Sequence, residues 1–144
     1  MNFRHIALTA ALVCTSLGGA FAVPAFAGPR AVIELFTSQG CSSCPPADKL
    51  LGQLAGDPSV IALSLPVDYW DYLGWKDTLA LHGHTVRQKA YAQARGDGAV
   101  YTPQVVVNGV VHALGSDKAA IEKAIAERSL PSTCAIPLTT TCGV

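Results

Sequence analysis

Two cysteines at Cys-x-x-Cys spacing, Cys41 and Cys44, constrain this chain more than any other feature of its sequence. They follow a nearly continuous apolar run at residues 31–36 and precede a stretch with helical periodicity at residues 47–55. A nearly continuous apolar run is typical of a strand that is covered on both faces within a parallel sheet. The sequence therefore places both thiols between a buried strand and the start of a helix.

Three chemistries use this spacing: a redox dithiol, half of a zinc site, and covalent haem attachment. Haem attachment requires a histidine after the second cysteine, and Pro45 stands there instead. A four-ligand zinc site needs a second pair of ligands at a suitable spacing. Cys134 and Cys142, with seven residues between them, match such a pair poorly. A redox dithiol is the favoured interpretation.

The first 27 residues have the features of a secretory signal peptide. Arg4 gives a basic start, residues 6–17 are apolar, and an Ala-x-Ala site ending at Ala27 predicts cleavage before Gly28. The apolar run is too short to span a bilayer. We therefore expect export to the periplasm or beyond, with no membrane anchor after cleavage, in a compartment that permits disulfides.

The remaining chain has the length of one domain, which we predict at residues 28–130, followed by a tail at residues 131–144. Loss of Arg4 would leave nine basic and ten acidic side chains, a net charge of about −1. The sequence contains no cluster of basic residues that would indicate nucleic acid as a partner. In the tail, Cys134 and Cys142 are predicted to form a structural disulfide; free thiols, or a relay with Cys41 and Cys44, are the alternatives.

The order of predicted elements indicates an α/β fold. Strands are expected at residues 30–36, 60–67, 104–107 and 110–113, and helices at residues 47–55, 78–95 and 117–128. Asn108-Gly109 predicts a tight hairpin between the last two strands. Two parallel crossovers followed by this hairpin would give a four-stranded mixed sheet with helices on both faces.

The middle helix, residues 78–95, has a pattern interrupted around His82 and His84. Leu79, Val86, Ala90 and Ala94 are the residues predicted to face the sheet. The two histidines are interpreted as exposed polar residues. A metal site is the alternative, because a loop could bring them together although their spacing puts them on different faces of a helix.

Two further features have open interpretations. Glu34 interrupts the first apolar run, and we expect it at an edge or strand end with its carboxylate in water; the alternative is a buried acid that moves protons near the dithiol. Residues 68–75 hold both tryptophans of the chain. They form either an aromatic flap over the core or one wall of a peptide-binding groove, to which we assign Trp70.

A family resemblance rests on three stretches: ELFTSQGCSSCPPAD at residues 34–48, VDYWDYLGWKD at residues 67–77 and YTPQ at residues 101–104. They resemble the secreted bacterial family catalogued as domain of unknown function 1223. The order of elements also resembles a minimal thioredoxin fold, with the dithiol after the first strand. The resemblance implies that Pro103 is cis and faces the dithiol, and that the backbone of Thr102 pairs with a bound peptide.

These observations predict an exported thiol–disulfide oxidoreductase that acts on protein or peptide thiols, without a cofactor and with an unidentified electron donor or acceptor. Cys41 would attack and Cys44 would resolve the mixed disulfide. Pro45 and Pro46 suit only the first turn of a helix, so the helix begins either at Ser42 or as late as Pro45. The strength of the helix dipole at Cys41, and hence oxidant or reductant character, stays open.

Two alternatives belong to other functional classes. The first is a protein that holds a soft ion such as Cu(I) between Cys41 and Cys44, completed by His82, His84 or His112. The second is a non-catalytic binding module that uses the aromatic loop and keeps the cysteine pair as a structural disulfide.

Overall fold

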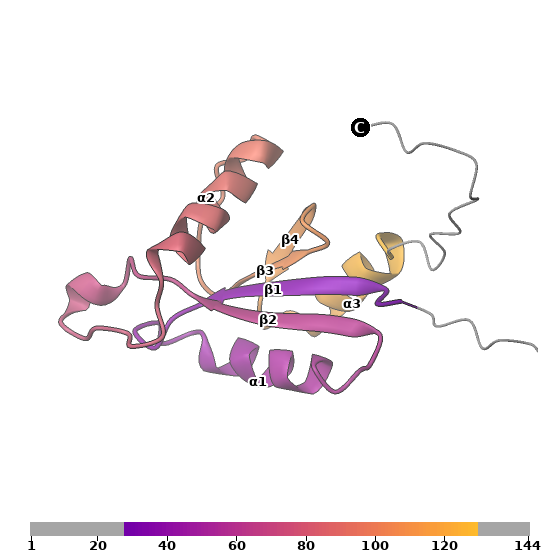
Figure 1. Cartoon of the computed structure of the whole chain (residues 1–144), viewed down its shortest axis with the longest axis horizontal. Coiled ribbons are helices and arrows are strands. Elements are labelled where there is room, and N and C mark those ends of the chain that lie inside the picture. The colour runs from indigo at the N-terminus through magenta and orange to yellow at the C-terminus, as the bar shows by residue number, and fades with distance from the viewer. Residues whose placement is uncertain (1–27, 130–144) are drawn as a thin grey trace, which may run out of the picture.

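The structure is a computed structural model, and it describes residues 28–129. The predicted signal peptide at residues 1–27 and the tail cysteines, Cys134 and Cys142, lie outside the described residues. Between Gly28 and Ser129, no helix has the length and apolarity needed to cross a bilayer. The elements, labelled in Figure 1, are β1 (Ala31–Thr37), α1 (Pro45–Leu54), β2 (Val60–Pro66), the short 3-10 helix η1 (Asp71–Leu73), α2 (His82–Arg95), β3 (Gln104–Val107), β4 (Val111–Leu114) and α3 (Lys118–Glu127).

The four strands form one mixed sheet in the order β2-β1-β3-β4, which confirms the predicted fold class. Strand β1 pairs in parallel with β2 and antiparallel with β3, and β4 completes the hairpin. The prediction of a second parallel crossover is therefore wrong. After α2 crosses the sheet, residues 96–103 return the chain to the end at which β2 stopped, so β3 has to run the opposite way. The arrangement is consistent with a thioredoxin-like fold.

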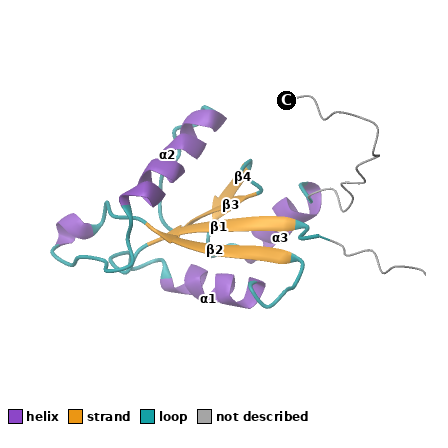
Figure 2. Cartoon of the chain, in the orientation of Figure 1, coloured by secondary structure: helices purple, strands orange, loops and turns teal. Residues whose placement is uncertain are grey.

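Helices cover both faces of the sheet, as predicted. On one face, α1 and α3 pack against the sheet; the core residues there include Ile33, Leu35, Leu50, Ile121 and Ile125. On the other face lies α2, over a smaller cluster of Phe36, Val67 and Val106. In Figure 1, α1 lies below the sheet and α2 above it. Figure 2 shows the loop between β2 and α2 extending beyond the end of the sheet at which α1 begins.

Helix α2 turns a different face to the sheet from the one predicted. Its buried residues are Thr85, Gln88 and Ala92, whereas Leu79, Val86, Ala90 and Ala94 are exposed. Hydrogen bonds explain the choice, because Gln88 Nε2 donates to the Tyr101 carbonyl at 2.7 Å and to Gln104 Oε1 at 2.8 Å. Buried amides need partners, and only this rotation of the helix supplies them.

Glu34 is buried in the middle of the sheet, only 3% exposed, so the expectation of a carboxylate in water is wrong. Its Oε1 accepts from Arg87 Nη2 and from the Tyr91 hydroxyl, both at 2.8 Å. Burial by itself raises the pKa of Glu34, but the hydrogen bonds from Arg87 and Tyr91 and the charge of Arg87 outweigh it and hold this pKa below its usual value. Burial and the neighbouring Glu34 raise the pKa of Tyr91 to about 12. A carboxylate held in its charged form by two α2 residues anchors that helix and is a poor proton carrier.

This ion pair predicts a pH-dependent stability. Arg87→Ala leaves Glu34 buried with a single donor, and we expect a loss of about 1–3 kcal/mol in the free energy of unfolding at pH 7. Because the folded pKa of Glu34 is depressed, its contribution is present above the unfolded pKa and is lost as pH falls through the folded value. The difference between variant and wild type should therefore shrink toward pH 4.

Urea unfolding at pH 7 and pH 4 measures both effects. Lys118→Ala is the control, since Lys118 and Glu122 form an exposed pair and its removal should change little at either pH. An Arg87→Ala penalty that is equal at the two pH values would contradict the assignment.

Candidate functional site

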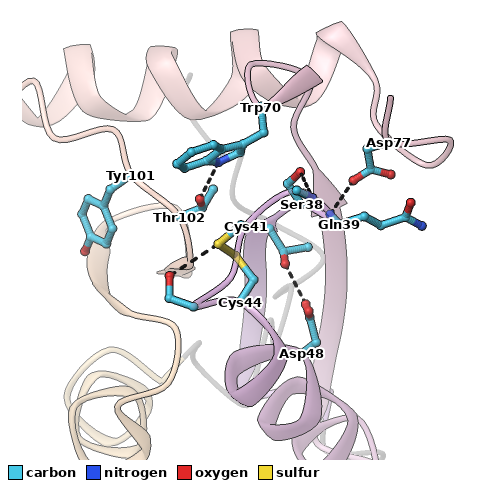
Figure 3. The surroundings of a disulfide bond; sticks show 12 residues. Ser38, Gln39, Cys41, Cys44, Asp48, Trp70, Asp77, Tyr101 and Thr102 are labelled. Atoms are coloured by element: carbon cyan, nitrogen blue, oxygen red, sulfur yellow. Dashed lines mark hydrogen bonds between the residues drawn. A yellow bond between two sulfur atoms is a disulfide. The ribbon is translucent and has the colours of Figure 1, made fainter. Parts of the chain in front are cut away.

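Cys41 and Cys44 form a disulfide with an S–S distance of 2.13 Å. The backbone turns between them, with Cys44 N donating to Cys41 O at 3.2 Å, and the intervening serines are exposed. Cys44 has no exposed surface, whereas Cys41 retains 4% and lines a surface pocket. Figure 3 shows the pair at the top of α1. An incoming sulfur would therefore reach Cys41 before Cys44.

Helix α1 begins at Pro45, so the later of the two predicted starts is confirmed. Pro45 and Pro46 have no N–H, and the first two amide groups that exist, on Ala47 and Asp48, both donate to the Cys44 carbonyl at 2.9 and 3.0 Å. The first turn of α1 therefore has no free backbone N–H group that could donate to the Cys41 sulfur. The polar contact of that sulfur is the Ser43 hydroxyl, whose Oγ lies 3.5 Å from Cys41 Sγ.

Pro103, from a distant segment, packs beside the start of α1. The Thr102–Pro103 bond is cis, as the resemblance implied. Gly115 N donates to the Pro103 carbonyl at 2.9 Å. A Cβ on Gly115 would lie 2.9 Å from Pro103 Cβ and 3.0 Å from Ala47 Cβ, so these two residues face one another across the glycine. Ala47 is three residues beyond Cys44, which puts the proline segment next to the disulfide.

Trp70 connects the dithiol loop to the proline segment. Its Nε1 donates to Thr102 Oγ1 at 2.8 Å, and its Cβ lies 3.2 Å from the position that a Cβ on Gly40 would occupy. Figure 3 shows Trp70 and Thr102 beside Cys41. Trp70 is half-buried and packs on the α2-side core, whereas Tyr72 and Trp75 are 78% and 62% exposed. The core-flap interpretation is thus confirmed for Trp70, and a role of this loop in peptide binding stays a prediction.

Asp77 fixes the aromatic loop to the dithiol loop, and the sequence analysis did not single it out. The side chain is 2% exposed, and its Oδ2 accepts from Gln39 N at 2.8 Å while its Oδ1 accepts from Leu79 N at 2.9 Å. Trp75 Nε1 also donates to Gln39 Oε1, at 3.3 Å. Asp77 is the last residue of one of the stretches that carry the family resemblance, and this position was the sequence feature that could have identified it.

A pocket of about 250 Å³ opens beside Cys41. It is lined by Thr37, Ser38, Gln39, Cys41, Pro45, Asp48, Ser64, Pro66, Asp77 and Leu79. Two carboxylates, those of Asp48 and Asp77, thus share the pocket with the disulfide. Asp48 Oδ1 accepts from Thr37 Oγ1 at 2.8 Å, which holds it at the first turn of α1. Sequence reasoning missed Asp48, because only the fold brings it to the same hollow as Cys41.

The three histidines of the metal hypothesis have other partners. His82 Nδ1 lies 2.9 Å from Asp68 Oδ2, and His84 Nδ1 lies 2.8 Å from the Pro66 carbonyl. His112 Nδ1 lies 2.9 Å from the Tyr101 hydroxyl. Among residues 28–129 there is no group of three His, Cys, Asp or Glu side chains arranged to hold a metal ion. No histidine in that range completes a site at the cysteine pair.

Comparison with known proteins gives a family and a fold. A family model described as "Protein of unknown function (DUF1223)" matches residues 32–142. A crystal structure of a protein from Agrobacterium tumefaciens matches with 47% sequence identity and a TM-score of 0.66, over 69% of this chain and 45% of that one. The chain thus spans less than half the length of that relative. The comparison with curated proteins found no match.

The close approach at Gly115 predicts a large effect of a small substitution. Gly115→Ala should lower the free energy of unfolding by about 1–3 kcal/mol, because the added methyl group overlaps Leu35, Pro103 and Ala47. Urea unfolding measures this loss. Gly52→Ala, on the exposed side of α1 with open space around it, is the control and should stabilise by about 0.5–1 kcal/mol. A neutral Gly115→Ala would contradict the packing described.

The Ser43 contact predicts a change in thiol reactivity. In the reduced protein, Ser43→Ala removes a donor from the Cys41 thiolate, and the alkylation rate at pH 7 should fall about two- to tenfold, since one hydrogen bond contributes about 0.5–1.5 kcal/mol. Iodoacetamide labelling of Cys41 followed by mass spectrometry measures the rate. Ser42→Ala is the matched control and should leave the rate unchanged; equal rates for both variants would exclude this role for Ser43.

Proposed function

This chain belongs to the DUF1223 family, whose description assigns it no function, and we propose from the geometry of its own site that it is a thiol–disulfide oxidoreductase acting on protein or peptide thiols. The observation that carries the proposal is the Cys41–Cys44 disulfide at the N-terminal end of α1, with one sulfur-bearing residue on a pocket and the other behind it. The site needs no cofactor for this chemistry, since the two sulfurs themselves carry the electrons.

The proposed exchange assigns a separate role to each cysteine. In the reduced protein, the Cys41 thiolate attacks one sulfur of a client disulfide, forms a mixed disulfide and releases the client's other sulfur as a thiolate. Cys44 then attacks Cys41 Sγ, which closes the Cys41–Cys44 disulfide and releases the second client thiolate; both client sulfurs take protons from water. Two electrons pass from the protein to the client. Run backwards, the same steps oxidise a client dithiol.

Residues that lie next to the disulfide support this proposal. Trp70 Nε1 donates to Thr102 Oγ1 beside the cis Thr102–Pro103 bond, and the resemblance implies that the Thr102 backbone pairs with a bound peptide. We assign these three residues to client binding. Export to the periplasm or outside the cell, also proposed, would put the pair where disulfides persist. In this scheme, the electron donor or acceptor of the Cys41–Cys44 pair is another protein that carries a thiol or a disulfide.

Removal of one cysteine at a time tests the mechanism. In Cys44→Ser, Cys41 can still attack but nothing resolves the product, so mixed disulfides with clients should accumulate in the host. Non-reducing gels and mass spectrometry of the purified chain detect them. In Cys41→Ser, the buried Cys44 should trap at least tenfold less, which makes this variant the matched control.

Turnover is measured separately, as dithiothreitol-driven reduction of insulin. The wild-type chain should accelerate it, and both single variants should lose the acceleration. If the wild-type chain shows no turnover and Cys44→Ser traps no client, the pair is a structural disulfide and the alternative of a non-catalytic binding module takes its place. Anaerobic loading of the reduced chain with Cu(I) separates the soft-metal alternative, which predicts a bound ion.

A further inference from the structure

Strand β2 has a free edge that leads toward the disulfide. The sheet order puts β2 at one margin, and no other strand within residues 28–129 pairs with its outer side. An edge strand leaves a row of backbone N–H and C=O groups for another extended chain to pair with. The far margin of the sheet, β4, belongs to a short hairpin of four-residue strands, whereas β2 has seven residues.

Apolar side chains follow the same edge. Ile61 and Leu63 are 43% and 41% exposed, although they lie within a strand. They alternate with Val60 and Ala62, which pack into the core on the α1 face, so they point to the α2 face. Helix α2 leaves them exposed: it bonds to Glu34 on β1 and to Gln104 on β3, and it meets β2 at the last residue, Pro66. The outer strip of this face is therefore apolar and open.

The strip continues into the segment before α2. Leu79 and Leu81 are 62% and 59% exposed. Leu81 N donates to the Pro66 carbonyl at 3.2 Å, which fixes this segment at the C-terminal end of β2. Ile61, Leu63, Leu79 and Leu81, which we call the β2 strip, are thus exposed apolar residues on β2 and on the segment that is bonded to its end. Exposed apolar surface of this kind commonly marks an interaction site.

Leu79 of the β2 strip also lines the pocket that contains Cys41, although Ile61 and Leu63 lie on the opposite face of β2 from the strand residues that line it. Ser64 and Pro66 of β2 and Leu79 of the following segment all line that pocket. The edge is open from Val60 to Leu65, since Leu81 N takes the carbonyl of Pro66, so a chain paired there would end beside the pocket that contains Cys41. This approach differs from that along Thr102 and Pro103, because β1 lies between β2 and β3 in the sheet.

We propose that the β2 strip binds an extended polypeptide segment of the client, with apolar residues flanking the cysteine that Cys41 attacks. The inference rests on the proposed function and names its class of substrate: unfolded or incompletely folded protein segments, in which such apolar sequences are accessible. A polypeptide is the occupant that fits, because only a second backbone satisfies the N–H and C=O groups of a strand edge while placing side chains on the apolar strip.

The test compares a peptide disulfide with a small disulfide that has the same leaving group. In the Cys44→Ser background, the reduced full chain reacts with a peptide whose cysteine carries thionitrobenzoate. The Cys41 thiolate attacks the peptide sulfur, and thionitrobenzoate leaves as a coloured anion. Three peptides are used: Leu and Ile around the cysteine, Ser and Asn in their place, and the apolar sequence with alternate N-methylated amides. Dithiobis(nitrobenzoate), which cannot pair with a strand, gives the reference rate.

We expect the apolar peptide to react at least tenfold faster than the polar and the N-methylated peptides. Leu63→Ser should lower its rate about fivefold, through the loss of one apolar contact, while the rate with dithiobis(nitrobenzoate) stays unchanged. Val110→Ser is the matched control, since Val110 is 53% exposed at the hairpin on the far end of the sheet and should leave every rate unchanged.

The outcomes separate this inference from the proposed function. Normal reaction with the small disulfide, together with equal rates for the three peptides or no effect of Leu63→Ser, overturns the inference and leaves the oxidoreductase proposal standing. The edge would then have another occupant, such as residues 130–144 or a second copy of the chain. No reaction of Cys41 with either kind of disulfide contradicts the proposed function itself.

Discussion

The contact of Pro103 with the first turn of α1, across Gly115, is the constraint on which the site depends. Three segments that are far apart in the chain meet where only a hydrogen atom fits between them. The peptide of Gly115 also holds the Pro103 carbonyl. Because interiors are packed as closely as crystals, this contact leaves little freedom for the proline segment to move away from the disulfide. A side chain at position 115 would separate the parts of the site.

A second constraint sets where the helix on the opposite face lies. Helix α2 has little apolar surface to bury, and its contacts with the sheet include an ion pair from Arg87 to Glu34 and an amide hydrogen bond from Gln88 to Gln104. Polar contacts are directional, so they fix the rotation of the helix more tightly than an apolar stripe would. They place the middle of α2 over β1 and β3, while the start of the helix meets the end of β2 at the Pro66 carbonyl. The exposed apolar residues on β2 follow from this placement.

The two sides of the disulfide have different characters. Toward β3, Trp70 and Thr102 close the site by a hydrogen bond. Toward β2, a pocket with two carboxylates opens to solvent beside Cys41. The helix N-terminus between them contributes less positive potential to Cys41 than its position suggests, because its first two residues are prolines and its next two amides bond to the Cys44 carbonyl. The reactive sulfur therefore contacts a hydroxyl rather than free amides, and it shares its pocket with two carboxylates.

The sequence by itself determined the local parts: the strands, the hairpin, and the closeness of Cys41 and Cys44, whose separation of three residues brings them together in any turn before a helix. It left the start of α1 open between Ser42 and Pro45, and the structure places it at Pro45. Only the tertiary structure decided the direction of β3, the buried face of α2 and the environment of Glu34. It alone placed Asp48 and Asp77 in one pocket with Cys41. The physical reason is range: periodicity and turn chemistry act over a few residues, whereas strand direction, buried ion pairs and pockets depend on partners tens of residues away.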